Sequence, residues 1–466
     1  MSLNCALILA AGEGTRMKTS KPKVMLEVLF KPMIDWVTDA VKAGGVEDIC
    51  VITGHKKEIV RAHLDNSIET AVQEELLGTG HAVMQASDFL NRHRHGNVLI
   101  LCGDAPLIDA ATISSALEYH NANKNAVTVI SAKVKNPFGY GRIVRSKNGV
   151  LKKIVEEKEA SNSEKIIDEV NSGAYWFNCS VLIDSLQGII DMHDKKGDKA
   201  QEYYLTDAIE VILNKGLNAV AYEASSSDII LGANTRVQLQ EINEIARKKI
   251  LNQKMLEGVS IPCPDGVIIS AEAKIGADTE ILPGTVILGN TVIGSDCVIG
   301  PNSHIEDSTI GNNVTLNNVF CYSSTVKDDA TVGPFARIRP GCVIGSGVKA
   351  GNFVEFKNST IGDHTSVAHL SYIGDADFGS NINVGCGCAT VNFTGKEKFR
   401  TQVEDNAFIG CSTYLVAPVK VGQNSYTAAG SVITEDVPEN SLAIARSRQT
   451  VKKGWVTKQK PYRWQK

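Results

Sequence analysis

The sequence has no long apolar run, no excess of basic residues and no cluster of cysteine and histidine residues, and each absence excludes a class of protein. Its 466 residues carry a formal net charge of −4, whereas a general nucleic-acid binder usually has a broad basic surface. The apolar run near the N-terminus, CALILAAG, follows no basic segment and is too short to span a bilayer. We therefore expect no nucleic-acid partner, no membrane span and a cytoplasmic location.

The eleven cysteines favour neither a disulfide framework nor a zinc site. Several lie alone in apolar segments, as Cys5, Cys50 and Cys102 do, which is typical of small buried side chains in a reducing compartment. Cys386 and Cys388 are too close together for ordinary zinc-ligand spacing, and no Cys/His cluster accompanies them.

The first half of the chain predicts an α/β domain over residues 1–233. Runs of β-branched residues alternate with amphipathic segments, which indicates a Rossmann-like, mostly parallel sheet that binds ligands at the carboxyl ends of its strands. Strands are expected at residues 5–9, 48–53, 98–102 and 126–134, and a helix at 32–43. Residues 234–260 are expected to be a helical connector, because Leu239, Ile242, Ala246 and Ile250 recur at helical spacing.

The second half has a six-residue period. Isoleucine recurs at positions 269, 275, 281, 287, 293, 299 and 305, and this spacing predicts an all-β parallel β-helix of hexapeptide repeats over residues 261–440. The phase slips and then resumes at Ile310, Leu316 and Tyr322, and again at Ile361, Val367 and Ile373. We interpret the slips as inserted loops. Residues 441–466 leave the repeat and are expected to form a basic C-terminal arm.

Two groups of polar residues are candidates for chemistry. In the first half, Gly12 and Gly14 follow the first strand and favour an anion-binding loop near Arg16 and Lys23, and Asp104 ends a later strand where a carboxylate commonly holds a divalent metal. In the second half, polar residues gather around the phase slips, with two cations and a hydroxyl suited to a sugar phosphate and a histidine suited to proton transfer. These are Arg339, Lys357, His369, Tyr372 and Asn383.

Six motifs carry a specific resemblance: LAAGEGTRM, SKPKVM, ELLGTGHA, CGDAPL, GYGRIV and IVEEK. They look like the sugar-1-phosphate nucleotidyltransferases. Followed by a hexapeptide β-helix, they resemble the family of bifunctional N-acetylglucosamine-1-phosphate uridyltransferases/glucosamine-1-phosphate acetyltransferases over nearly the whole chain. That family implies a left-handed β-helix, a homotrimer, Mg²⁺, and UTP, acetyl-CoA and glucosamine-1-phosphate as small-molecule substrates.

The resemblance also implies roles for residues of the first half. Arg16 and Lys23 would act in catalysis on the phosphates, and Asp104 and Asn234 would bind magnesium. The UTP and UDP-N-acetylglucosamine site would comprise Leu9, Ala10, Ala11, Gly12, Gly14, Lys23, Gln73, Gly78, Thr79, Gly141, Glu156, Asn171 and Asn234.

For the second half, the resemblance implies that His369 is the general base and that Arg339, Lys357, Tyr372 and Asn383 bind glucosamine phosphate. Acetyl-CoA would lie in a groove between neighbouring β-helices, against Cys386, Asn392, Phe393, Cys411, Ala429 and Arg446. The sequence departs from the family pattern at Cys386, Phe393 and Cys411, all on the acyl-donor side. Two alternatives stay open: a nucleotidyltransferase whose β-helix only oligomerises or regulates, and a nucleotide-sugar sensor without catalysis.

Overall fold

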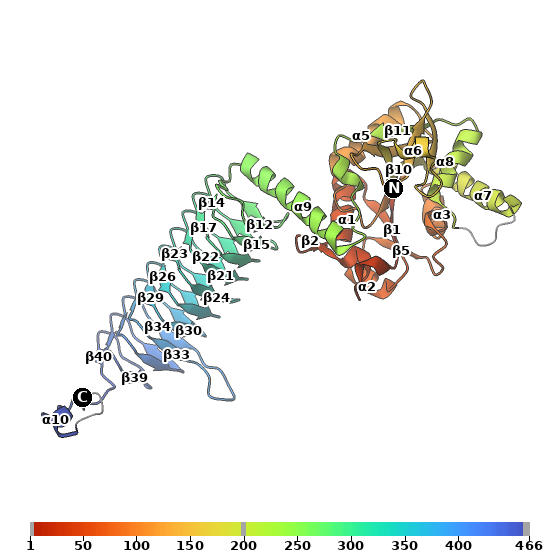
Figure 1. Cartoon of the computed structure of the whole chain (residues 1–466). Coiled ribbons are helices and arrows are strands. Elements are labelled where there is room, and N and C mark those ends of the chain that lie inside the picture. The colour runs from red at the N-terminus through yellow and green to blue at the C-terminus, as the bar shows by residue number, and fades with distance from the viewer. Residues whose placement is uncertain (1–3, 197–201, 460–466) are drawn as a thin grey trace. The chain divides into compact units, whose positions relative to one another are not determined.

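The computed structural model of the protein describes residues 4–196 and 202–459, which fall into two compact units (Figure 1). The first unit ends at residue 248 and the second begins at residue 249. The division falls within α9 (Arg236–Leu256). Along this helix Leu239, Ile242, Ala246 and Ile250 are buried, as their helical spacing predicts.

The first unit is built on one sheet, in which β10 is the one strand of the main path that runs antiparallel to its neighbours. The strands expected from the sequence form β1, β4, β6 and β7 of this sheet. Its strand order is β11 (Ala219–Glu223), β7 (Val127–Lys133), β10 (Glu169–Asn178), β6 (Asn97–Cys102), β1 (Asn4–Ala10), β4 (Asp48–Thr53) and β5 (Glu69–Val72). A hairpin of β8 (Arg142–Arg145) and β9 (Leu151–Val155) joins it through β10.

Helices cover both faces of this sheet because alternate side chains of a strand point to opposite faces. Ala6 and Ile8 of β1 pack in a core with α1 (Met33–Ala43) and α5 (Ala110–Ala122). Cys5 and Leu7 pack in a second core. The helices of that second core are α3 (Thr79–Met84), α4 (Ser87–Arg92), α7 (Cys179–Lys196) and α8 (Leu205–Asn214).

The second unit is a left-handed parallel β-helix with three parallel sheets (Figure 1). From β12 to β39, each strand pairs with the third strand along the chain, so one coil contributes one short strand to each sheet. The first sheet runs from β12 (Ile268–Ile269) to β39 (Val432–Ile433), the second from β13 (Lys274–Ile275) to β37 (Val419–Val421), and the third from β14 (Glu280–Ile281) to β40 (Leu442–Ala443). Since β40 still pairs with β38 (Tyr426–Thr427), the repeat extends to residue 443.

The seven isoleucines of the six-residue period are all buried in the solenoid, as predicted. Two expectations from its phase slips were wrong. The inward residue of β21 (Val319–Tyr322) is Cys321, which pairs with Ile305, and Tyr322 is the next residue, at the strand end. The slip from Ile305 to Ile310 is a turn one residue shorter than the usual spacing, rather than an inserted loop.

One true insertion interrupts the repeat near the predicted acetyltransferase residues. The inward residue of β33 (Ala389–Val391) is Thr390, and the next inward residue is Val403 in β34 (Thr401–Val403), thirteen residues later instead of five or six. The intervening loop closes on itself through a bridge between Phe393 and Lys398. Among the described residues, no helix is both long and apolar enough to cross a membrane.

Candidate active sites

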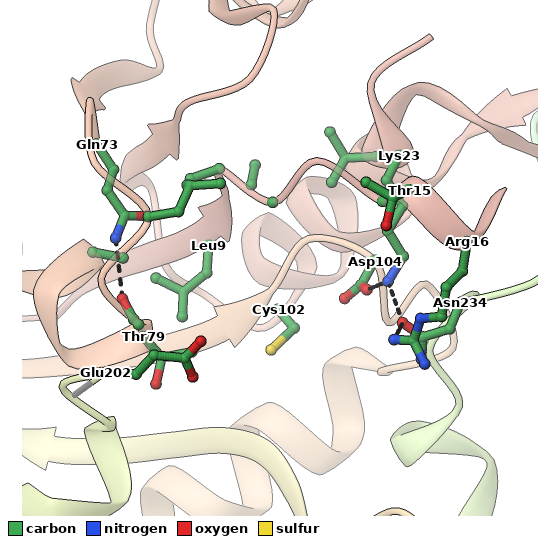
Figure 2. Close-up of a pocket in the computed structure, with 18 residues that line it drawn as sticks. Leu9, Thr15, Arg16, Lys23, Gln73, Thr79, Cys102, Asp104, Glu202 and Asn234 are labelled. Carbon is green, nitrogen blue, oxygen red and sulfur yellow. Dashed lines mark hydrogen bonds and ion pairs between the residues drawn. The ribbon is translucent and has the colours of Figure 1, made fainter. Parts of the chain in front are cut away.

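The first unit has a cavity of about 400 Å³ at the carboxyl edge of its sheet (Figure 2). This volume lies within the usual range of small-molecule sites. Twelve residues predicted for nucleotide or metal binding line it: Leu9, Ala10, Ala11, Gly12, Gly14, Arg16, Lys23, Gln73, Gly78, Thr79, Asp104 and Asn234. They come from segments spread over more than two hundred residues, and the carboxyl ends of β1, β5 and β6 bring most of them together.

Gly14 allows the loop after β1 to lie close to Lys23. Its backbone has a φ of 63°, in the left-handed region that side chains disfavour. A Cβ atom at this position would lie 2.8 Å from the Cβ of Lys23. The glycine therefore sets both the turn of the loop and the position of the lysine.

Lys23 lies between two oxygen ligands that come from distant parts of the chain (Figure 2). Its ammonium forms an ion pair with the Asp104 carboxylate and donates to Asn234 Oδ1 at 2.7 Å. Arg16 donates to the same Asn234 oxygen at 3.0 Å. Two cationic side chains and a carboxylate thus share one end of the cavity, an arrangement suited to phosphate and to a divalent cation.

The other end of the cavity combines amide and backbone groups with one carboxylate, that of Glu202 (Figure 2). Gln73 is buried. Its backbone N–H donates to Thr53 O at 2.8 Å, and its side-chain Nε2 donates to Gly78 O at 3.0 Å. Gly78 has a φ of 98°, and a Cβ there would lie 2.5 Å from the carbonyl oxygen of Tyr203. The amide and backbone groups at this end offer hydrogen-bond donors and acceptors.

Gly141, Glu156 and Asn171 do not line the cavity but form a group of their own. Asn171 N donates to Gly141 O at 2.8 Å, and a Cβ at Gly141 would lie 3.4 Å from Glu156 Oε1. Burial raises the pKa of the Glu156 carboxyl, with smaller contributions from Glu159 and Asp207. The group approaches the cavity through Gly173, whose carbonyl lies 3.9 Å from the Sγ atom of Cys102, a residue of the cavity wall.

Sequence reasoning missed several residues of the cavity wall. Thr15 and Val24 are sequence neighbours of predicted residues. Cys102 is the last residue of β6, close to Asp104, so its position at a strand end is the signal that identifies it. Leu76 and Ala82 lie within the ELLGTGHA motif. Glu202 has no signal of this kind, because it reaches the cavity from a segment without a motif.

In the β-helix, a buried carboxylate organises the predicted sugar-phosphate residues. Asp375, which is 5% exposed, accepts from Asn358 Nδ2 at 2.7 Å, from Lys357 Nζ at 3.1 Å and from Asn392 Nδ2. Burial would raise the pKa of Asp375, but these hydrogen bonds together hold it below its ordinary value. Asp375 was not predicted; the signal for it is its place one coil from Lys357 and Asn358.

The surroundings of Asp375 carry an excess of positive charge. Arg339 donates to Glu355 Oε1 at 3.0 Å. Lys398, from the inserted loop, lies near Lys357, and the neighbouring ammonium lowers the pKa of Lys398. Three cationic side chains therefore lie beside two carboxylates, those of Glu355 and Asp375, and this excess of positive charge suits an anionic ligand such as a sugar phosphate.

Tyr372 and His369 complete one face of this site. Tyr372 begins β30 (Tyr372–Gly374), whose end, Gly374, pairs with Lys357 of β27 (Glu355–Lys357). His369 ends β29 (Ser366–His369), is exposed, and lies at the corner just before Tyr372. Asn383 lies on the sheet of β29, paired with Ser366. One chain therefore does not bring Asn383 onto the face of Tyr372 and Lys357.

The predicted acetyl-CoA residues divide between two corners of the solenoid. At the corner of His369, backbone hydrogen bonds step from coil to coil: Gly387 N to His369 O at 3.4 Å, Ser412 N to Cys386 O at 2.7 Å, and Gly430 N to Cys411 O at 2.8 Å. Ala429 precedes Gly430, and Arg446 Cδ would lie 3.7 Å from a Cβ at Gly430. Asn392 and the exposed Phe393 lie instead at the Asp375 corner.

Comparison with known proteins matches both units. The family model described as nucleotidyl transferase matches residues 5–229, the one described as bacterial transferase hexapeptide matches residues 272–307, and the hexapeptide repeat of succinyl-transferase matches residues 400–435.

Relatives match over nearly the full length. The Bifunctional protein GlmU of Acetivibrio thermocellus is 48% identical to this chain, and the match covers 99% of both proteins. Those of a Geobacillus species and of Staphylococcus epidermidis are 48% and 47% identical, with 97% of this chain covered in both, and 97% and 99% of those proteins.

Proposed function

This chain belongs to the family of bifunctional GlmU proteins, which make UDP-N-acetylglucosamine by N-acetyl and uridylyl transfer, and we propose which of its residues carry each reaction. The cavity of the first unit would carry uridylyl transfer, and the His369 face of the β-helix would carry acetyl transfer. The observation that carries the proposal is the convergence of Lys23, Asp104 and Asn234 in a cavity lined by the predicted nucleotide residues.

In the uridylyl reaction, a phosphate oxygen of N-acetylglucosamine-1-phosphate attacks the α-phosphorus of UTP, and pyrophosphate leaves. Arg16 and Lys23 hold the phosphates and offset charge that develops on them, so the chain needs no protein nucleophile. Gln73, Gly78 and Thr79 contact uracil, while Leu9 to Gly12 and Gly14 wrap the nucleotide. Gly141, Glu156 and Asn171 hold the amino sugar beyond Cys102.

Asp104 and Asn234 fit a magnesium ion. Their oxygens already converge on one cation, the Lys23 ammonium, and a carboxylate with an amide oxygen is a donor set suited to Mg²⁺ completed by substrate phosphates. When bound, the ion neutralises negative charge on the triphosphate.

In the acetyl reaction, the amine of glucosamine-1-phosphate attacks the thioester carbonyl of acetyl-CoA. His369 takes the proton that the amine loses, since a histidine side chain ordinarily titrates near neutral pH. The amide bond forms, the carbon–sulfur bond breaks, and the sulfur of coenzyme A leaves and takes a proton. Arg339, Lys357 and Tyr372 hold the sugar phosphate. Asn383 completes this site from a neighbouring copy of the chain, because its own solenoid places it on a different sheet.

The acyl donor lies in a groove that two copies of the chain complete. Cys386, Cys411, Ala429 and Arg446 contact it from the His369 corner, and Asn392 and Phe393 from the Asp375 corner. Because one solenoid places these two sets on different corners, a neighbouring copy brings the second set to the first.

An apolar stack at the His369 corner supports assembly into a homotrimer. Phe335, Phe353 and Leu370 occupy successive coils, each more than half exposed, with the two phenyl rings stacked 5.5 Å apart. All three have a positive φ, from 44° to 61°. Bulky apolar residues rarely adopt this conformation, and exposing them is unfavourable, so a partner surface accounts for both features. The homotrimer works in the cytoplasm.

Two assays on purified protein test the proposal. Pyrophosphate release from UTP and N-acetylglucosamine-1-phosphate in the presence of Mg²⁺ tests the first unit, with Lys23→Met as the control. Formation of N-acetylglucosamine-1-phosphate from glucosamine-1-phosphate and acetyl-CoA tests the second, with His369→Ala as the control. Unchanged activity in either control would overturn the corresponding assignment.

A further inference from the structure

Three of the eleven cysteines differ from the rest. Burial raises the pKa of the thiols of the other eight, to about 12 for Cys50, Cys102 and Cys321. Thiols of this kind are protonated at neutral pH and react slowly, because the thiolate is the nucleophile. The eight are Cys5, Cys50, Cys102, Cys179, Cys297, Cys321, Cys342 and Cys388.

Of the other three, Cys263 and Cys386 are partly exposed and Cys411 is exposed. Cys263 lies before the first strand of the β-helix, far along the solenoid from the other two. Cys386 and Cys411 lie on adjacent coils, at the corner that also carries His369.

Cys386 and Cys411 lie side by side. The hydrogen bond from Ser412 N to Cys386 O, at 2.7 Å, pairs the two cysteines across neighbouring coils. Strands of a sheet are roughly 4.8 Å apart, and a disulfide bridges Cα separations of about 4.4–6.8 Å. Cys411 Sγ lies over the residue before Cys386, because a Cβ built on Gly385 would be 2.9 Å from that sulfur.

We propose that Cys386 and Cys411 are a thiol pair that the disulfide of coenzyme A oxidises within the acetyl-CoA groove, which blocks acetyl transfer. The proposal rests on the acetyltransferase assignment made above. With His369 as the base, the sulfur of bound coenzyme A lies near His369, and Cys386 is one coil away. A bound coenzyme A disulfide would thus meet Cys386 first and Cys411 next.

The reaction consists of two thiol–disulfide exchanges. The Cys386 thiolate attacks one sulfur of the coenzyme A disulfide; a mixed disulfide forms, and one coenzyme A thiolate leaves and takes a proton. The Cys411 thiolate then attacks the Cys386 sulfur and displaces the second coenzyme A as its thiolate. The two protein thiols lose two hydrogens and two electrons in total, and the coenzyme A disulfide gains them as two thiols.

The groove makes the oxidation selective for coenzyme A disulfide. Arg446 and the other groove residues that hold acetyl-CoA would hold coenzyme A disulfide in the same way, whereas glutathione disulfide lacks the nucleotide and the pantetheine arm. The cavity of the first unit should be spared, because burial raises the pKa of its one lining thiol, Cys102, to about 12. The two activities of one chain therefore respond differently to the same oxidant.

The test uses the reduced full-length protein, treated with equal concentrations of coenzyme A disulfide or glutathione disulfide. Intact-mass and peptide spectra locate the modification, and both products are measured before and after treatment. Each variant is compared with its own untreated sample: Cys386→Ala, Cys411→Ser and, as the matched control with a partly exposed thiol outside the groove, Cys263→Ala.

The expected outcome differs for each protein. The unsubstituted chain and Cys263→Ala lose two hydrogens at Cys386 and Cys411, and acetyl transfer falls in proportion to the fraction oxidised while uridylyl transfer is unchanged. Cys411→Ser stops at the mixed disulfide and keeps one coenzyme A moiety, and Cys386→Ala gains none. Dithiothreitol restores the activity.

Three results would overturn the proposal: no modification of Cys386 or Cys411, equal oxidation by glutathione disulfide, or full acetyl transfer by the oxidised chain. An untreated protein that transfers no acetyl group would instead overturn the acetyltransferase assignment. The mass spectra would in that case still report whether the thiol pair reacts.

Discussion

Lys23 and Asn234 are 211 residues apart in the chain, yet the ammonium of Lys23 donates to the side-chain oxygen of Asn234 at 2.7 Å. The same ammonium pairs with Asp104. A single cation therefore ties the loop after β1 to the end of β6 and to the segment before α9. This contact is the strongest structural indication that the first unit binds phosphate groups.

Replacement of Lys23 by Met should lower kcat of uridylyl transfer on the order of 100- to 1,000-fold, which is the usual cost of losing one group that stabilises the transition state. Methionine preserves the length of the side chain but removes its charge. Pyrophosphate release measures the effect, and acetyl transfer by the same sample is the internal control. An unchanged kcat would show that Lys23 only ties the loops together.

Substitution of Gly14 by Ala should displace Lys23, because the new Cβ would lie 2.8 Å from the Cβ of Lys23. A shift of roughly 1 Å at a reacting group can lower the rate about 100-fold. Gly45→Ala is the matched control, since Gly45 also has a positive φ, 84°, but has open space around its Cβ position. Equal losses in both variants would point to backbone strain instead of displacement.

Much of this architecture was predictable from local sequence patterns. The period of six identified the β-helix, because an inward aliphatic side chain is needed once per strand in every coil. The slips were misread, however, since a turn shortened by one residue and an inserted loop both shift the phase. Only the coil-to-coil pairing distinguishes them, as the pairing of Ile305 with Cys321 does.

The sites were predictable in part. Strand-end position suffices to place Asp104 beside the loop after β1, because parallel strands end at the same edge. It does not identify Glu202, or the separation of Asn392 from Cys386 on two corners, because those depend on contacts between distant segments. Asp375 was missed because a single aspartate in a repeat resembles an ordinary turn residue.

Replacement of Asp375 by Asn should impair acetyl transfer by weakening the hold on Lys357, Asn358 and Asn392, because the amide keeps one acceptor oxygen and replaces the other with an NH2 group. We expect the KM for glucosamine-1-phosphate to rise about tenfold, equivalent to about 1.4 kcal/mol of binding, with a smaller change in kcat. The β-helix should also lose about 1–3 kcal/mol of stability, because the one remaining acceptor oxygen cannot serve three donors. Steady-state kinetics and urea unfolding measure the two effects.

Asp377→Asn is the matched control for Asp375→Asn. Asp377 lies two residues away and pairs with the exposed Arg400, and surface ion pairs typically contribute about 0–1 kcal/mol. Its KM should therefore stay close to that of the unsubstituted chain. If the Asp375→Asn variant has an unchanged KM but a reduced stability, Asp375 is a purely structural residue.

Replacement of Phe335, Phe353 and Leu370 together by Asn should convert the trimer to monomers. Asparagine tolerates a positive φ, so the turns should keep their conformation while the apolar surface is removed. Light scattering during size-exclusion chromatography measures the mass. Acetyl transfer should fall with the trimer and uridylyl transfer should persist. Val237→Asn, which removes an exposed apolar side chain from α9, should leave the mass unchanged.

His120 near the end of α5 should make the first unit less stable in mild acid. It is 2% exposed, and its Nδ1 atom lies 3.0 Å from the hydroxyl of Thr128. That hydroxyl accepts from Asn125 Nδ2 at 3.0 Å, so its own proton is available to a neutral imidazole. Burial lowers the pKa of His120 to about 4.

The sign of the pH dependence follows from the direction of this shift. Below its ordinary value near 6.5, His120 binds a proton in the unfolded chain but stays neutral in the folded one, so stability falls as the pH drops from about 6.5 to about 4. The full contribution is roughly 3 kcal/mol, at 1.36 kcal/mol for each pH unit. Above pH 6.5 the effect is absent.

Tryptophan fluorescence during urea unfolding measures this loss, because the Trp176 indole donates to the carbonyl of Ile113 in α5 at 3.1 Å and so reports on the helix that carries His120. The urea concentration at the unfolding midpoint should decrease as the pH is lowered from 7 to 4.5. His120→Gln should be less stable at pH 7 but should show a flatter slope, since glutamine does not titrate. If the two slopes are equal, carboxylates elsewhere in the unit cause the acid sensitivity and His120 does not.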